Sequence, residues 1–530
     1  MHFSRSTILW LLFGIILGTG IFLRSFSFSE WLRFNDDQAR DAAIVSAMFT
    51  SDTLPLLGPK AGGTGFYLGP AFYYIESASV FLFGNTPEAL AYPVLIASIV
   101  FLVLYFLVAQ KLFSPHVALA TTAVLAVSFF HIKYSRFAWN PNLTPLFSLL
   151  FLVSLERLLT LRNLAPWYWV LLLGLSFGIG VQLHSTLLFL MPVLSFGSLL
   201  IAWRCNIPLK KLLLAMGAAL ILNAPILFSE IQHGGENTAA FWRGLHTKTS
   251  KDDSLPEKIR HAGTCLIQGS TTIVSTLSFN DDCDLLAKKY QKSPWFWPRV
   301  IGEAIFFFGG ILLMWLAAQQ EADTAKRTRL FLLLAALAIF SLFLIPLGGE
   351  APLRFLVVII FIPFLLLGFW LDFLFTRNTQ LGRLVLVLLL PTLCFLNLSI
   401  YYRVYPDQER TVIRDYFGGQ RLGNIQPIAA AIAEDIRKDE DLAGQYWIVG
   451  WEASRGLHYL VQQEGIPNIN FTSFDTLWEN RGISPITAAY IAKPDGKTIE
   501  KNYTRNLAAF SVESERKVKN YTLLKIRPLP

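Results

Sequence analysis

Eleven long apolar runs occupy most of the first 402 residues of this chain and constrain its fold more than any other feature. They cover residues 7–23, 88–109, 116–132, 143–159, 166–183, 185–203, 209–229, 299–318, 329–346, 353–375 and 384–402. A helix needs about 20 mostly apolar residues to cross a bilayer. The pattern therefore predicts a polytopic α-helical membrane protein with about eleven transmembrane helices.

The polar residues support the same fold class. Charged residues make up 15% of the chain, against about 25% in soluble domains. The 45 Lys and Arg residues lie dispersed between apolar runs rather than in a basic tract, which argues against a nucleic-acid partner. A membrane lipid environment is expected instead.

Lys and Arg residues are concentrated in alternate connections between the runs. With the N-terminus in the cytoplasm, twelve basic residues fall in cytoplasmic connections and three in the short opposite loops, as the positive-inside rule requires. Eleven spans then place the loops 24–87 and 230–298 and the tail 403–530 on the outer side. The short apolar stretch 72–83 is expected to be an interfacial or re-entrant helix. We expect a multi-pass protein of the bacterial inner membrane.

The tail alternates expected strands with helical patterns, which predicts a small extracytoplasmic α/β domain over 403–530, after a transmembrane module over 1–402. The expected strands are 446–450, 469–474, 488–492 and 521–526, and the expected helices are 425–438 and 454–464.

Three carboxylates and two arginines lie together directly after the first apolar run. Alanines at helical spacing predict a helix over 38–48, which Asp36 or Asp37 would open as its N-cap. On that interpretation the acidic pair is only a cap. Alternatively, one of the two carboxylates is a general base that removes a proton from an acceptor hydroxyl or amine.

The sequence contains no strong metal or nucleotide motif, and no cofactor is expected to be required. The eight His are scattered, and no His-Glu-x-x-His, paired Cys-x-x-Cys or phosphate-binding glycine loop occurs. Weak binding of a divalent cation by Asp36 and Asp37 stays open. Cys265 and Cys283 both fall in the second outer loop, where they form either a disulfide or two free thiols.

Residues 36–42, Asp-Asp-Gln-Ala-Arg-Asp-Ala, resemble the acidic-Ala-Arg signature in the first external loop of GT-C glycosyltransferases. The similarity is strongest to the relatives of protein O-mannosyltransferases and of the lipid A aminoarabinose transferase ArnT. Residues 56–60 and 65–74 resemble the Gly/Pro loop and the Pro-x-x-Tyr helix that follow in that family. The resemblance implies a GT-C fold and an inverting transfer of a sugar from a polyprenyl-phosphate donor at the outer face of the inner membrane.

The resemblance matches Asp37 to the catalytic Asp of the family. The family usually has Glu at the next position, where this chain has Gln38, and Asp36 is the candidate to replace that second carboxylate. Basic and polar side chains at the outer ends of the spans would contact the donor, because its phosphate keeps a negative charge as it leaves. The candidate substrate-binding residues are Arg40, Lys60, Tyr67, Arg136, His184 and Arg354.

Each of these side chains also has a structural interpretation. The basic residues could anchor helix ends at the headgroups, which we favour for the neighbouring Lys133, and His184 could bond a backbone carbonyl. A lipid or solute transporter is the alternative function class, and a lipid-carrier glycan ligase or polymerase is a further one. The sequence identifies neither the sugar nor the acceptor, which could be a protein, a lipid or a glycan.

Overall fold

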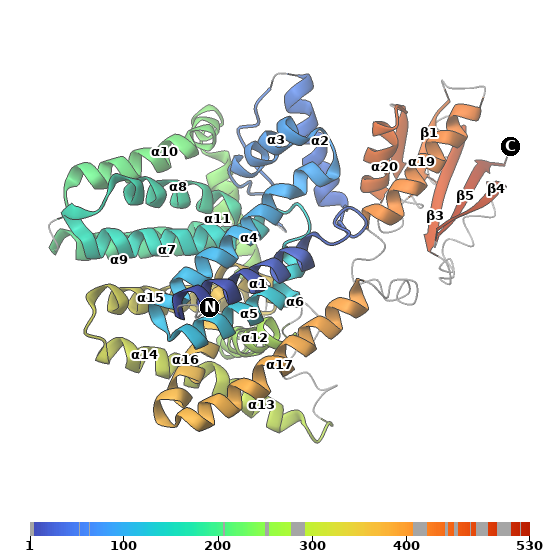
Figure 1. Ribbon diagram of the computed structural model, residues 1–530. Coiled ribbons are helices and arrows are strands. Elements are labelled where there is room, and N and C mark those ends of the chain that lie inside the picture. The colour runs from blue at the N-terminus through green and yellow to red at the C-terminus, as the bar shows by residue number, and fades with distance from the viewer. Residues whose placement is uncertain are drawn as a thin grey trace.

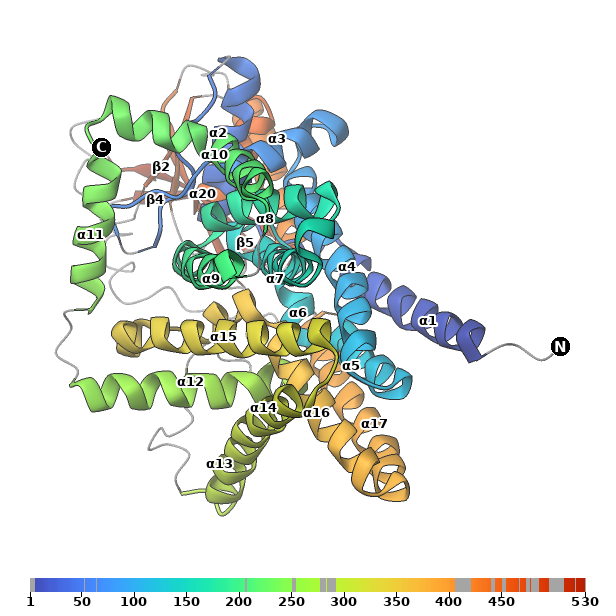
Figure 2. The same ribbon diagram turned by 90° about the vertical axis from the view of Figure 1, so that its left-hand side faces the viewer.

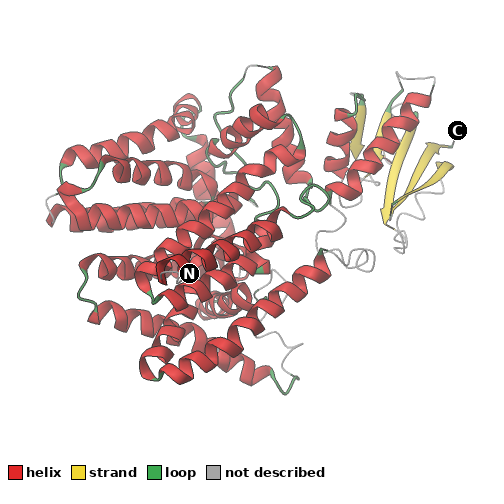
Figure 3. Cartoon of the chain, in the orientation of Figure 1, coloured by secondary structure: helices red, strands yellow, loops and turns green. Residues whose placement is uncertain are grey.

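The computed structural model is mostly helical, with one small sheet near the C-terminus (Figures 1 and 3). It describes residues 5–51, 53–62, 64–204, 207–249, 254–276, 283, 292–405, 421–439, 444–449, 454–466, 468–472, 477, 486–494, 510–519 and 521–529.

Within these residues, seven helical segments are long and apolar enough to cross a membrane. Five of them are single helices: α1 (Arg5–Ser25), α4 (Pro87–Leu112), α10 (Leu209–Gln232), α15 (Thr324–Leu347) and α17 (Thr379–Val404). The sixth is α7 (Thr144–Leu161), which has the turn η1 (Asn140–Leu143) before it and η2 (Arg162–Leu164) after it. The seventh is α13 (Phe296–Ala304), which continues through η3 (Ile305–Gly309) into α14 (Gly310–Gln320). An eighth span is counted if η5 (Leu353–Ile359) and α16 (Phe361–Arg377), which meet at 71°, are one broken span.

The remaining three expected spans correspond to shorter apolar helices, so the count of eleven stays a prediction. They are α5 (Pro115–Val127), α8 (Trp167–Leu183) and the apolar part, Ser185–Ile201, of α9 (Ser185–Arg204). The run 116–132 is interrupted because α5 ends at Ser128, whose hydroxyl accepts from the His131 backbone N–H at 3.4 Å and so opens the short helix α6 (Phe129–Tyr134).

Among the described residues, four helices lie entirely within the two expected outer loops. They are α2 (Asp36–Thr50) and α3 (Ala71–Phe83) in the first loop, and α11 (Glu236–Thr249) and α12 (Leu255–Ser275) in the second. Figure 2 shows α12 beside α15 and α11 at the edge of the helical body. The 3₁₀ turn η4 (Gly348–Glu350) joins α15 to η5.

The C-terminal part folds as a five-stranded mixed sheet with two helices (Figure 1). The strands are β1 (Tyr446–Val449), β2 (Ile469–Thr472), β3 (Ala488–Pro494), β4 (Phe510–Val518) and β5 (Tyr521–Pro528), in the order β2-β1-β3-β5-β4, and the helices are α19 (Leu422–Lys438) and α20 (Ser454–Gln463). β1 pairs in parallel with β2 and β3, whereas β5 pairs antiparallel with β3 and β4. The four strands and two helices expected here are present, and β4 was not predicted.

The tail packs directly onto the segment that leads into α2. The Leu422 N–H donates to the Leu32 carbonyl at 2.8 Å, and Lys519 Nζ lies 3.1 Å from Glu30 Oε1. The buried Phe34 packs against Tyr459 of α20 with ring centroids 5.7 Å apart. The chain immediately before α2 is therefore held between the helical body and the tail.

Candidate functional site

A cavity of about 1720 Å³ opens among the elements that the sequence places on the outer side. Asp37 and Arg40 of α2, Lys60, His184 and Arg354 all line it. The cavity thus brings together five of the eight side chains predicted to be catalytic or substrate-binding, although they come from four segments far apart in the chain.

The cavity has a polar side and an apolar side. The apolar wall consists of the start of α9, the end of α15 and part of α11, and it includes Leu188, Phe189, Leu342, Phe343, Leu347 and Phe241. Phe189 and Phe343 face each other with ring centroids 5.6 Å apart. No described residue of the tail is among those that line this cavity.

Asn35, and not Asp36 or Asp37, is the N-cap of α2. The Asn35 side chain accepts from the Asp37 N–H at 3.1 Å, and Gln38 Oε1 accepts from the Asn35 N–H at 3.2 Å, which completes a capping box. The expectation of an acidic cap is therefore wrong, because the preceding amide side chain already fills that position. Both carboxylates lie in the first turn, where the helix dipole favours negative charge.

Gln38 also ties α2 to the helical body. It is 2% exposed, and its Nε2 donates to the Ala138 carbonyl at 2.6 Å. A Glu in this place would have no hydrogen to donate when ionised. The departure from the usual family residue therefore has a local structural reason.

The two adjacent acidic residues point to different partners. Asp36 is exposed, and its Oδ1 accepts from the backbone N–H of Arg455 in α20 at 3.3 Å. Asp37 has a half-exposed side chain that faces the cavity, and its Oδ1 lies 3.1 Å from Arg40 Nη1. No described residue is hydrogen-bonded to the second carboxylate oxygen, Oδ2.

Arg40 lies between two carboxylates. Its Nε and Nη2 lie 2.9 and 2.8 Å from Oδ1 of Asp41, and its Nη1 contacts Asp37. Asp41 is completely buried, and burial raises its pKa to about 6 against the lowering effect of Arg40. Asp41 was not predicted as a site residue. Its spacing from Gln38 and Val45, on the buried face of α2, is the signal that could have found it.

Lys60 and Tyr67 face each other across a hairpin. They form an isolated antiparallel bridge, and Lys60 Nζ lies 5.9 Å from the centroid of the Tyr67 ring. Asn237 of α11 binds the backbone of Tyr67 through two hydrogen bonds of 2.7 and 2.9 Å. Lys60 is exposed and lines the cavity, whereas Tyr67 supports the hairpin beside it.

His184 lies at the turn between α8 and α9. Its Nδ1 accepts from the Thr186 N–H at 3.2 Å, which places the proton of the neutral ring on Nε2. The ring stands edge-on to Phe355 at 5.0 Å. The neighbouring Asn140, which also lines the cavity, donates to the Leu183 carbonyl at 2.5 Å.

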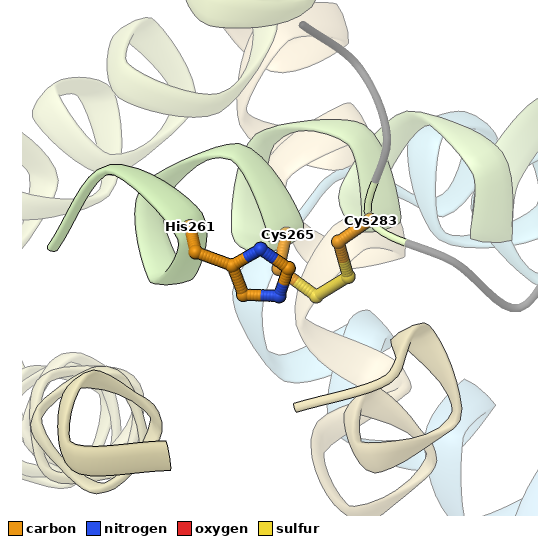
Figure 4. A group of neighbouring side chains, drawn as sticks. All are labelled: His261, Cys265 and Cys283. Carbon is orange, nitrogen blue, oxygen red and sulfur yellow. A yellow bond between two sulfur atoms is a disulfide. The ribbon is translucent and has the colours of Figure 1, made fainter. Parts of the chain in front are cut away.

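Arg354 is an exposed cation in η5 and forms no ion pair with any described residue. The residue Ala351, just before η5, contacts the disulfide that joins Cys265 of α12 to Cys283 (Figure 4). Both sulfur atoms lie 3.6 Å from the carbonyl oxygen of Ala351, and His261 Nε2 lies 3.3 Å from it. Of the two states left open by the sequence, the structure thus has the disulfide rather than two free thiols.

Arg136 has a different environment from the other predicted substrate contacts. It is buried, and its two terminal nitrogens donate to the carbonyls of Leu23, Arg24, Phe26 and Ser27 at 2.8–3.2 Å. The guanidinium therefore provides hydrogen-bond donors for the backbone carbonyls at and just after the C-terminal end of α1. It is not among the residues that line the cavity.

In the described part of the chain, one group of three side chains has the spacing and chemistry of a metal site. His261, Cys265 and Cys283 present ligand atoms within 4.8 Å of one another (Figure 4). Their sulfurs are joined in the disulfide, so no thiolate is present to bind a cation. Asp36 and Asp37 point to different partners, and a divalent cation on that pair stays a prediction.

The chain is similar to known proteins in part of its sequence and in its fold. Residues 68–228 match the family model for dolichyl-phosphate-mannose-protein mannosyltransferase, a segment that begins after the Asp37 motif. Two crystal structures of ArnT from Cupriavidus metallidurans, one in the apo state and one bound to undecaprenyl phosphate, align with a TM-score of 0.56 and 14% identity. Each alignment covers 98% of both chains. No curated protein matches the chain.

The fold therefore extends over nearly the whole chain, while the family sequence pattern covers less than a third of it. Together with the apolar helices, these matches identify an integral, multi-pass membrane protein. The chain has the fold of the two ArnT structures and, over residues 68–228, the sequence pattern of the mannosyltransferase family, which confirms the resemblance found in its sequence.

Proposed function

We propose that this protein is an inverting glycosyltransferase that moves a sugar from a polyprenyl-phosphate carrier to an acceptor at the outer face of the membrane. The observation that carries the proposal is the cavity, because it joins a carboxylate, several cations and an apolar wall. A lipid-linked sugar presents the matching chemistry: a hydrophilic sugar, a phosphate and a long hydrocarbon chain.

In this mechanism the acceptor hydroxyl or amine approaches Asp37 Oδ2 and gives up its proton as it attacks the anomeric carbon. The bond from that carbon to the phosphate oxygen breaks, and the carrier leaves as polyprenyl phosphate. Lys60 and Arg354 are placed to stabilise the charge on the leaving phosphate. The wall formed by α9 and α15 would hold the prenyl chain through apolar contacts.

The outer-face location is supported by the origin of the cavity residues. The first loop contributes Asp37 and Lys60, and three other connections expected on that side contribute His184, Arg354 and α11. One of the ArnT structures that share the fold is bound to undecaprenyl phosphate, which supports a donor of the same class here. We propose a bacterial inner membrane as the location and the outer side as the position of the tail.

The test measures release of free polyprenyl phosphate from a panel of polyprenyl-phosphate sugars by purified wild-type protein in nanodiscs. A general base contributes about 10²- to 10⁴-fold to the rate, so Asp37→Asn should lose most of the turnover. Asp36→Asn is the matched control, because it removes the adjacent carboxylate, which faces α20 instead of the cavity.

Turnover that survives in Asp37→Asn and disappears in Asp36→Asn would reverse the assignment of the base. Vectorial movement of a labelled carrier lipid in sealed vesicles, without release of polyprenyl phosphate, would favour the transporter alternative over the transferase.

A further inference from the structure

The polar network around Arg40 continues inward from the cavity to a buried carboxylate. Asp41 has no solvent exposure, and its Oδ1 accepts from Nε and Nη2 of Arg40. The hydroxyl of Tyr73, on the neighbouring helix α3, donates to the same oxygen at 3.2 Å. Asp41 Oδ2 has no hydrogen-bond partner among the described residues.

A second buried carboxyl group lies close by on α3. Glu76 is also without solvent exposure, and neither of its oxygens bonds any described residue. Burial, with a further contribution from Asp41, raises the pKa of Glu76 well above its usual value. Asp41 contacts Arg40 directly and Glu76 does not, so Asp41 is the buried carboxyl that balances the charge of Arg40.

This arrangement divides the donors of one guanidinium between two carboxylates. Two nitrogens of Arg40 point to the buried Asp41, and one contacts Asp37 in the cavity. If Asp41 carried no charge, the guanidinium of Arg40 could form two hydrogen bonds with Asp37 instead of one, since arginine prefers bidentate pairing with a carboxylate. A bidentate pair would occupy both oxygens of Asp37, including the one that faces the acceptor.

We propose that Asp41 is a positioning residue, which holds Arg40 against α2 so that Asp37 keeps one oxygen open to accept a proton from the acceptor. The inference rests on the proposed function, in which Asp37 is the base. It adds a buried residue that acts on the reaction only through Arg40.

The proposal predicts a characteristic pH dependence. The titratable groups that face Asp41 are Arg40 and Asp37 on α2, and Tyr73 and Glu76 on α3. Because the pKa of Asp41 is raised to about 6, the carboxylate exists above that pH and is lost as the pH falls through it. Turnover should therefore fall on the acidic side, with an inflection near pH 6.

The experiment measures kcat from pH 5 to 8.5 for polyprenyl phosphate release by wild type, Asp41→Asn and Tyr73→Phe in nanodiscs. Asp41→Asn mimics the protonated residue at every pH, so kcat at pH 7.5 should fall about 10- to 100-fold, the scale of a small misplacement of a catalytic group. The inflection near pH 6 should also disappear. Tyr73→Phe removes a hydrogen bond that stabilises the charged Asp41, so the inflection should move to higher pH.

Glu76→Gln is the matched control, because it replaces a buried carboxyl on the adjacent helix, one that forms no hydrogen bond with Arg40, by its amide. It should keep both the rate and the pH profile. A wild-type inflection that stays in Asp41→Asn would overturn the inference, as would an unmoved inflection in Tyr73→Phe. If Asp41→Asn does not fold, the pH profile of Tyr73→Phe tests the inference by itself. Absence of turnover in wild type, or full turnover in Asp37→Asn, would instead contradict the proposed function itself.

Discussion

Gln38→Glu is a nearly isosteric change that should destabilise the protein more at high pH than at low pH. The Nε2 group of Gln38 donates to the Ala138 carbonyl at 2.6 Å in a site that is 2% exposed. After the substitution two acceptor oxygens face each other, unless the introduced carboxyl is protonated. A glutamic acid in the unfolded chain has a pKa of about 4.3.

The magnitude follows from two competing ways to relieve this contact. Protonating the introduced carboxyl costs about 1 kcal/mol at pH 5 and about 5 kcal/mol at pH 8. Breaking the contact and leaving a buried polar group unpaired costs about 1–3 kcal/mol. The process with the lower free-energy cost determines the loss of stability at each pH. The expected loss is therefore about 1 kcal/mol at pH 5, where the carboxyl is protonated, and about 3 kcal/mol at pH 8, where the contact breaks.

The sign agrees with proton linkage. Folding raises the pKa of the introduced carboxyl, so its favourable contribution is present at low pH and is lost as the pH rises through the folded-state pKa. The assay is the melting temperature of wild type and variant in one detergent at pH 5 and pH 8. Gln38→Met, which has no donor and no charge, should lose the same amount at both pH values. An equal loss for Gln38→Glu at pH 5 and pH 8 would refute the reasoning.

Three further predictions concern the support of the site. Replacing both Cys265 and Cys283 by Ser should cost about 3 kcal/mol, the usual value for a bridge that closes a loop of this size; a reductant should lower the melting temperature of wild type and leave that of the double variant unchanged. Arg136→Lys should lower the melting temperature, because an ammonium cannot reproduce the four carbonyl contacts, while KM for the lipid-linked sugar stays the same. A raised KM with an unchanged melting temperature would instead indicate that Arg136 contacts the phosphate of the donor. Asp36→Ala should weaken docking of the tail by about 1 kcal/mol, or about fivefold in the docking equilibrium, and limited proteolysis should then release the tail faster than in Asp36→Asn or wild type.

The sequence predicted five of the side chains that line the cavity, whereas its count of eleven spans stays a prediction. Connections that the charge alternation assigns to the same side of a membrane are expected to lie together, so this pattern could group Asp37, Lys60, His184 and Arg354. Hydropathy could not show that Ser128 divides one apolar run into two helices, because that break depends on a side-chain hydrogen bond.

The roles of two arginines depend on tertiary contacts that no local pattern contains. Arg136 lies in a segment that resembles a family loop, yet its partners are carbonyls more than 100 residues away. Arg40 owes its position to Asp41 and, through it, to Tyr73 of a different helix. Sequence similarity could predict that both lie near the outer face. It could not predict whether each guanidinium binds a phosphate, a carboxylate or a carbonyl, because that depends on tertiary packing.

Asp36 and Asp37 contact different parts of the molecule, so the first turn of α2 connects the tail to the cavity. One carboxylate is fastened to α20 and the next is the proposed base, and consecutive residues of one helical turn cannot move separately. A molecule that binds the tail and shifts α20 would therefore alter turnover without entering the cavity. By reciprocity, a substrate that draws Asp37 inward would change how tightly the tail holds that molecule.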